Sequence, residues 1–258
     1  MKLLEMLAVV VTVVALVTGQ LCAQAAPKPS DPVKWSQPVD VESGWNVYSF
    51  WHEGDNGPLV TAADDWKCPN GLPVTDLHWW GSYIEGQPGG VTSFEISFHT
   101  NIPAGQELGH PSHPGALIRR VVVPVGEGGV QETFFSETPT HNIYQYNLKA
   151  SSPEDYFPQV MGQIYWLNII GISDNSTTWG WHTALRPGPD NGLDAAVNIY
   201  DYNPDSGQYT EWGSLYDGQG AVQLAFELTT VPEPASLALV GSAALVLMGL
   251  VYRRKMTN

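Results

Sequence analysis

One segment, residues 62–83, holds the densest set of side chains that could do chemistry. Its sequence, AADDWKCPNGLPVTDLHWWGSY, contributes three carboxyl groups, those of Asp64, Asp65 and Asp76. A glycoside hydrolase needs two such groups about 5–9 Å apart, one as acid and the other as base or nucleophile. The same oxygens suit Ca²⁺, which prefers hard ligands. A third interpretation is structural: Asp64 and Asp65 close a turn, and Asp76 caps a strand end. Sequence alone leaves all three open.

A second candidate for calcium lies at residues 201–207, DYNPDSG. Asp201, Asn203 and Asp205 follow the D-x-N-x-D spacing that opens a calcium loop. Ser206 stands where that loop requires glycine, and its final acidic ligand is missing from the expected position. The segment therefore predicts either a polar hairpin turn or a calcium loop of another type. Structural calcium is the one cofactor that the sequence suggests.

Tryptophan offers a different chemistry, because an exposed indole can stack on a sugar ring. All ten tryptophans lie within residues 26–230. Trp79 and Trp80 are adjacent, and consecutive strand residues point to opposite faces, so one of the two should face outward or line a groove. Trp179 and Trp181 should share a face. These four indoles form a candidate carbohydrate platform, and the alternative is that they fill a core.

Short apolar and aromatic runs predict a chain made of strands. In VTSFEISFHT, residues 91–100, Phe94, Ile96 and Phe98 recur with a period of two, which is typical of a strand with one buried face. Turns rich in Gly, Asn and Pro separate such runs. We expect an all-β, antiparallel two-sheet sandwich that is jelly-roll-like. The other expected strands are 45–51, 117–125, 133–136, 142–148, 163–172, 177–182, 195–202 and 221–229.

The charge of the middle of the chain excludes one class of partner. Residues 26–230 hold seven Lys and Arg against 24 Asp and Glu. Such a surface repels nucleic acid, because it has few cations to replace the counterions of phosphate. Cys68 is the single cysteine in this stretch, so it has no partner for an internal disulfide, and we expect it to be buried. No phosphate loop, Gly-x-Ser-x-Gly elbow or Cys-x-x-Cys pair occurs, so no catalytic residue is assigned, and the open alternative of a carboxylate pair among Asp64, Asp65 and Asp76 is the one catalytic possibility.

The first 25 residues read as a signal peptide. Lys2 precedes an uncharged apolar run over residues 6–17, and Ala23-Gln24-Ala25 matches an A-x-A cleavage site. Residues 26–40 are rich in Pro and charge and predict an extended lead-in. A single β-sandwich domain should then occupy residues 41–230.

Residues 231–258 differ in composition from the rest of the chain. The apolar stretch 235–252 would span about 27 Å as a helix, close to the ~30 Å hydrocarbon core of a bilayer. The basic residues after it favour the cytoplasmic side, which leaves the domain outside. We therefore expect a single transmembrane helix. The segment opens with Val231, Pro232, Glu233 and Pro234 and closes with the basic cluster Arg253, Arg254 and Lys255.

This order of parts resembles the PEP-CTERM sorting signal of Gram-negative bacteria. The Pro-Glu-Pro triad, the helix rich in small residues and the basic end all match. The resemblance implies that an exosortase cuts near the triad and releases or transfers the domain. The chain would then be exported as a precursor anchored in the inner membrane and end at the cell surface or outside the cell. The resemblance also implies an association with extracellular polysaccharide.

The middle of the chain resembles an uncharacterised family of secreted β-rich proteins from environmental bacteria. That resemblance supports the fold and secretion and implies no activity. The expected function is therefore that of a non-enzymatic cell-surface or matrix protein. A carbohydrate-binding module and a glycoside hydrolase or lyase are the alternatives. The matching segments are 63–66, 73–81, 112–115, 164–167, 179–181 and 224–228.

Overall fold

The computed structural model describes residues 32–54, 60–85, 88–107, 110–174, 177–186, 194–199, 202–203, 208–209 and 212–230, and for residues 85, 202, 203, 208 and 209 it describes the backbone alone. The predicted signal peptide (1–25), the sorting tail (231–258) and the predicted helix 235–252 lie outside these residues. Within the described ranges, no helix has the length and apolar character needed to cross a bilayer.

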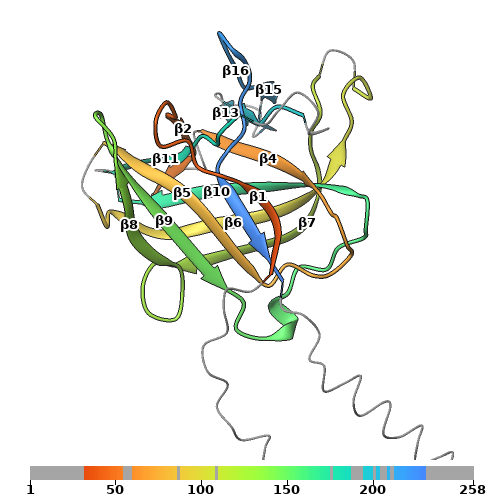
Figure 1. Ribbon diagram of the computed structural model, residues 1–258, viewed down its shortest axis with the longest axis horizontal. Helices are drawn as coiled ribbons and strands as arrows, with labels where there is room; N and C mark the ends of the chain where they lie inside the picture. Colours follow the sequence, from red (N-terminus) through yellow and green to blue (C-terminus); the bar gives the residue numbers. More distant parts are fainter. Residues whose placement is uncertain are drawn as a thin grey trace, which may run out of the picture. The chain divides into compact units, whose positions relative to one another are not determined.

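Seven strands form the first of two large sheets, called sheet 1 (Figure 1). Its central strand, β5, pairs with β9 on one side and with β18 and then β11 on the other. All pairings between its strands are antiparallel. The strands are β1 (Val33–Gln37), β18 (Phe226–Thr229), β5 (Asp76–Glu85), β11 (Thr178–His182), β2 (Asn46–Tyr48), β9 (Asn142–Lys149) and β8 (Gln131–Glu137).

Sheet 2 also has seven strands and is built in the same way around β10. β6 pairs along one side of β10, while β4 and then β3 pair along the other. β3 is parallel to β10, and the other described pairings of this sheet are antiparallel. The strands are β15 (Gly213–Ser214), β12 (Val197–Ile199), β4 (Thr61–Lys67), β10 (Ile164–Ser173), β6 (Val91–Ile102), β7 (His113–Pro124) and β3 (Phe50–His52).

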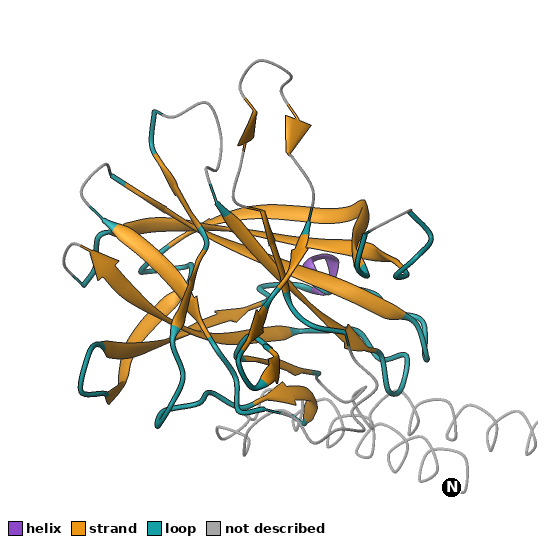
Figure 2. Ribbon diagram, turned by 90° about the horizontal axis from the view of Figure 1, so that it is seen from above, coloured by secondary structure: helices purple, strands orange, loops and turns teal. Residues whose placement is uncertain are grey.

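Short elements complete the described part, which consists of strands and loops with one short helix (Figure 2). The predicted all-β, antiparallel two-sheet sandwich is confirmed. The remaining elements are two small hairpins, β13 (Tyr202–Asn203) with β14 (Gln208–Tyr209) and β16 (Tyr216–Asp217) with β17 (Gly220–Ala221), and the 3₁₀ helix η2 (Pro153–Asp155).

Aromatic side chains hold the two sheets together. Phe94 of sheet 2 contacts Trp79, Tyr146 and Trp179 of sheet 1, with ring centroids 5.1, 4.8 and 5.1 Å away. Trp79 and Tyr146 stack on each other at 5.6 Å. All four side chains are fully buried. Each such pair adds about 0.5–1.5 kcal/mol beyond the burial of its area, so this cluster stabilises the contact between the two sheets.

Two glycines make room for the indole of Trp179. A Cβ atom on Gly81 of β5 would lie 2.3 Å from Cζ2 of Trp179, which is far inside van der Waals contact. A Cβ on Gly171 of β10 would lie 3.1 Å from the Cβ of Trp179. One glycine comes from each sheet, so the close approach of both backbones depends on residues without side chains.

Three expectations about the strands need correction. Asp64 and Asp65 do not close a turn but lie inside β4. The run 45–51 is not one strand, because β2 joins sheet 1 and β3 joins sheet 2, with Ser49 between them. The lead-in 26–40 contains β1, which pairs with β18, so the domain begins before residue 41.

The described domain begins and ends at one place. The backbone N–H of Thr230 donates to the carbonyl of Pro32 at 3.1 Å, and Val33 pairs with Thr229 across β1 and β18. Figure 1 shows the two ends of the coloured ribbon emerging on the same side. In the sequence, the Val-Pro-Glu-Pro segment therefore begins two residues after the end of β18, which is paired on both sides in sheet 1.

Candidate functional site

The two aspartates of β4 are completely buried. Asp64 faces sheet 1, and its carboxylate accepts hydrogen bonds from the backbone N–H of Leu224 (2.6 Å) and of Asp65 (2.8 Å). Burial, and then the charge of Asp65, raise the pKa of Asp64 well above its ordinary value. Asp65 lies on the opposite face of β4, where burial and then the carboxylate of Asp194 raise its pKa to about 8. Neither side chain can reach a substrate, so these two do not form the predicted acid–base pair.

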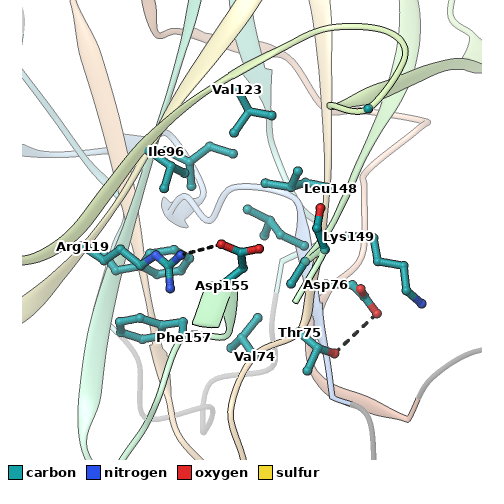
Figure 3. A pocket seen from close by; sticks show the side chains of 16 residues that line it. Val74, Thr75, Asp76, Ile96, Arg119, Val123, Leu148, Lys149, Asp155 and Phe157 are labelled. Atoms are coloured by element: carbon teal, nitrogen blue, oxygen red, sulfur yellow. Dashed lines mark hydrogen bonds and ion pairs between the residues drawn. The ribbon is translucent and has the colours of Figure 1, made fainter. Parts of the chain in front are cut away.

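Asp76 lies in sheet 1, beside a cleft of about 200 Å³ lined by β5, β6, β7 and β9 (Figure 3). Its carboxylate accepts a hydrogen bond from the hydroxyl of Thr229 at 2.9 Å. The walls of the cleft are mostly apolar, and Arg119 reaches Asp155 across it at 3.4 Å. The same guanidinium donates to two backbone carbonyls around η2, so it fixes that turn. The third predicted carboxylate is thus on a different sheet from Asp64 and Asp65.

All four tryptophans of the predicted platform are buried. Trp79, Trp179 and Trp181 belong to the core between the sheets, so the prediction that the last two share a face is confirmed. Trp80 lies on the opposite face of sheet 1 from Trp79, as expected, but only 8 % of it is exposed. Phe135 packs edge-on against it at 5.8 Å, with cover from Val39 and Val41 and neighbours Ile143, Ala184 and Ala225. The expectation of an exposed indole here is wrong.

The predicted calcium ligands are not assembled in the described part of the chain. No group of three or more His, Cys, Asp or Glu side chains lies close enough to hold a metal among the residues that the structure describes. Asp201 and Asp205 fall outside those residues, and Asn203 is described by its backbone alone. The calcium loop at 201–207 stays a prediction. Cys68 is buried and free, as expected.

A groove of about 490 Å³ lies on the outer face of sheet 2, the face turned away from sheet 1. β6 explains why this face is polar. Glu95, Ser97 and His99 line the groove, whereas Phe94 and Ile96 alternate with them and point into the core. The period-two pattern of the strand thus builds the core on one side and the groove on the other.

A hydrogen-bond network fixes the groove floor. The amide of Asn168 in β10 donates to the hydroxyl of Thr61 in β4. The imidazole of His99 contacts the carbonyl of Gly115 through Nδ1 (3.2 Å) and the hydroxyl of Ser97 through Nε2 (2.9 Å). The carbonyl can only accept, so Nδ1 carries the proton and Ser97 donates to Nε2. Burial lowers the pKa of His99 below 6.5, which keeps the ring neutral.

The groove carries one pair of opposite charges. Arg120 of β7 forms an ion pair with Glu95, and their side chains are 52 % and 11 % exposed. Glu95 is the one carboxylate among the described residues that line the groove. Since His99 is neutral, the described lining carries no net charge.

Two partly exposed tryptophans line the groove, and their neighbours on β10 place them toward opposite ends of that strand. Trp51 belongs to β3 and pairs with Ile172 near the end of β10. Trp212 packs on the small cluster that contains Trp166, at the start of β10. Six residues of strand separate the two positions on β10, a span of about 20 Å. The groove is therefore an elongated, open site with a neutral polar floor and an indole toward either end of β10.

Sequence reasoning missed this site. Trp51 and Trp212 are isolated in the sequence, and their common position depends on two separate pairings with sheet 2. One signal was available, because the polar residues of the 91–100 alternation mark the outer face of β6 as clearly as its apolar residues mark the inner face.

The fold and the groove define an all-β sandwich that presents an open polar site on one sheet. The chain belongs to the family described as a domain of unknown function, DUF7901, whose model matches residues 33–229. A second model, the PEP-CTERM protein-sorting motif, matches residues 230–255. No curated protein and no solved structure matches the chain.

The second family model confirms that the last residues of the chain form a PEP-CTERM sorting motif. Val231, Pro232, Glu233 and Pro234 fall at its start, and Arg253, Arg254 and Lys255 at its end. The chain is thus an exported protein of the Gram-negative type that an exosortase sorts. The match to DUF7901 likewise agrees with the expected uncharacterised β-rich family.

Proposed function

We propose that this protein is a non-enzymatic cell-surface or matrix protein that binds a neutral extracellular glycan in the groove of sheet 2. The observation that carries the proposal is the pair of partly exposed indoles, Trp51 and Trp212, that line a polar groove. Sugar rings offer both apolar faces, which stack on indoles, and hydroxyls, which bond to fixed polar groups. A volume of about 490 Å³ is in the range of small-ligand sites.

The charge of the groove favours a neutral glycan over a polyanion. Glu95 and Arg120 compensate each other, and the ring of His99 is neutral. The domain as a whole is strongly acidic, which repels an anionic polymer at long range. Binding should therefore depend little on salt.

The carboxylates favour binding over hydrolysis. Glycoside hydrolysis by the common mechanisms requires two carboxyl groups on either side of the bond. Glu95 is the single carboxylate in the described lining, and it is engaged by Arg120. Asp64 and Asp65 are buried away from solvent.

The sorting motif supports a surface location. In this proposal, helix 235–252 anchors the precursor in the inner membrane until the exosortase acts. The domain would then be attached or released where extracellular polysaccharide is present. The groove would supply the attachment to that polymer.

A glycan array tests the proposal. The probe is the full-length protein in detergent, applied to neutral hexose oligosaccharides and to uronic acid oligosaccharides. We expect binding to the neutral set, and a loss of about 10- to 100-fold in affinity for Trp212→Ala, as is typical of a stacked aromatic anchor.

Trp45→Ala is the matched control, because Trp45 is 39 % exposed and does not line the groove. It should bind like the wild type. The absence of glycan binding in the wild type, or equal losses in both variants, would refute the proposal.

A further inference from the structure

A group of three buried side chains and one exposed side chain lies where β1 of sheet 1 meets β4 of sheet 2. Gln37 of β1 donates from Nε2 to the carbonyl of Asp65 and to Oε1 of Gln223, both at 3.3 Å. Gln223 in turn donates from Nε2 to the carbonyl of Asp194 at 2.6 Å. The negative charge of Asp194 is, after burial, a cause of the raised pKa of Asp65, and the backbone N–H of Asp194 approaches the carboxylate of Asp65. These residues are called the Asp65 cluster: Gln37, Asp65, Asp194 and Gln223.

The Asp65 cluster has more acceptors than donors. By hydrogen-bond distance and angle, both carboxylate oxygens of Asp65 and Oε1 of Gln37 are buried and unpaired among the described residues. Burial raises the pKa of Asp65 by more than the backbone N–H groups of Asp194 and Asp65, which lie near its carboxylate, lower it. Asp65 is 0 % exposed and Gln37 is 7 % exposed. Both amide nitrogens of the two glutamines are already engaged. No Lys or Arg within the described ranges forms an ion pair with either aspartate.

A buried carboxylate in this position needs a positive partner or a proton. An unpaired buried charge is strongly disfavoured, and a second carboxylate beside it adds repulsion. A hard cation would coordinate the two carboxylate oxygens of Asp65 and Oε1 of Gln37, and its charge would offset those of both aspartates. The raised pKa of Asp65 has the same physical origin, burial and then Asp194.

We propose that Asp65 and Asp194 bind a calcium ion, with Oε1 of Gln37 as a further ligand. Calcium accepts irregular sets of carboxylate and amide oxygens, whereas Mg²⁺ demands near-ideal octahedral geometry and retains several waters. With two carboxylates, water would complete the coordination shell of six to eight oxygens that calcium prefers. The site is not the predicted one, because Asp64 and Asp76 take no part in it.

The ion would join β1 at the edge of sheet 1 to β4 in sheet 2. Asp65 pairs with Trp166, and Trp166 belongs to the cluster against which Trp212 packs. Calcium would therefore stabilise the part of the groove that holds Trp212. The site itself stands without the glycan proposal, since no residue of the cluster lines the groove.

Thermal unfolding of the full-length protein in detergent tests the site. After treatment with EDTA, about 10 mM calcium should raise the wild-type Tm by about 3 to 10 °C, given the weak affinity usual for extracellular modules. Asp65→Asn and Asp194→Asn should each remove most of this rise. Asp76→Asn is the control and should keep the full rise, because Asp76 takes no part in the hydrogen bonds that define the cluster.

Terbium luminescence gives a readout that does not depend on stability. Trp166 is the strand neighbour of Asp65, so its indole should sensitise bound Tb³⁺. Added calcium should quench that emission in the wild type, and Asp194→Asn should lower calcium affinity at least about tenfold. Asp194 is exposed, so this variant keeps the packing and carries the test even if Asp65→Asn does not fold. A wild-type Tm that calcium does not change, or a calcium response that persists in Asp194→Asn, would overturn the proposal.

Discussion

The two faces of sheet 2 are built from the same strands but differ sharply in chemistry. The inner face presents Phe94 and Ile96 to a core of stacked aromatic rings, while the outer face presents Glu95 and Ser97 to an open groove. Because successive side chains of β6 and β10 point to opposite faces, alternate residues of one strand contribute to core stability and to the groove. Substitutions at neighbouring positions should change one property and spare the other.

Phe94→Ala should have the largest effect on stability. The ring is fully buried and contacts three aromatic side chains of sheet 1, so its removal leaves a cavity between the sheets. We expect a loss of about 3–5 kcal/mol in the free energy of unfolding, measured by urea denaturation. The folded fraction should still bind glycan. A loss under about 1 kcal/mol would contradict the assignment of the inner face as the core.

His99 should give a smaller, pH-dependent effect on the outer face. Burial lowers its pKa in the folded state below the ordinary 6.5. The unfolded chain then binds more protons below about pH 6.5, so the stability contributed by neutral His99 is present above that pH and is lost as the pH falls through the folded pKa. The difference in free energy of unfolding between wild type and His99→Asn should shrink on acidification. A difference that stays constant from pH 7 to pH 4 would show that the ring does not titrate as the network requires.

Arg120→Gln should have the smallest effect on stability. The guanidinium is about half exposed, which limits the contribution of the pair, but the side chain of Glu95 is only 11 % exposed. The substitution leaves this carboxylate unpaired in the groove, so the lining becomes negative. Chemical denaturation should detect a loss of about 1–2 kcal/mol in the free energy of unfolding, and glycan binding should become sensitive to salt. A stability loss above about 2 kcal/mol would mean that the pair belongs to the structural core.

Much of the fold could be predicted from the sequence, because strands with one buried face alternate visibly. β6 is an example, since VTSFEISFHT shows its register directly. β4 was missed because two adjacent aspartates inside a strand violate that alternation, and both are buried. Nothing in the local sequence reveals that Leu224, distant in the chain, supplies the hydrogen bond that Asp64 accepts.

The candidate site was harder to predict than the fold. The tryptophans at 79–80 and 179–181 were predicted to form a platform, yet three of them lie in the core and Trp80 is covered by Phe135, Val39 and Val41. The indoles that line the groove are single, partly exposed residues, Trp51 and Trp212, brought together by β3 and by the segment before β15. The two tryptophans line the same groove because the segments that carry them join the same sheet, and that arrangement depends on contacts between residues distant in the sequence.

The most direct test of the central claim is the ratio of two dissociation constants. The full-length protein is titrated with the neutral oligosaccharide that binds best, comparing Trp51→Ala with Trp45→Ala. Both substitutions remove one partly exposed indole, and Trp51 alone lines the groove. The account predicts that Trp51→Ala binds about tenfold or more weakly than Trp45→Ala. Equal dissociation constants for the two variants would contradict a glycan site on the outer face of sheet 2.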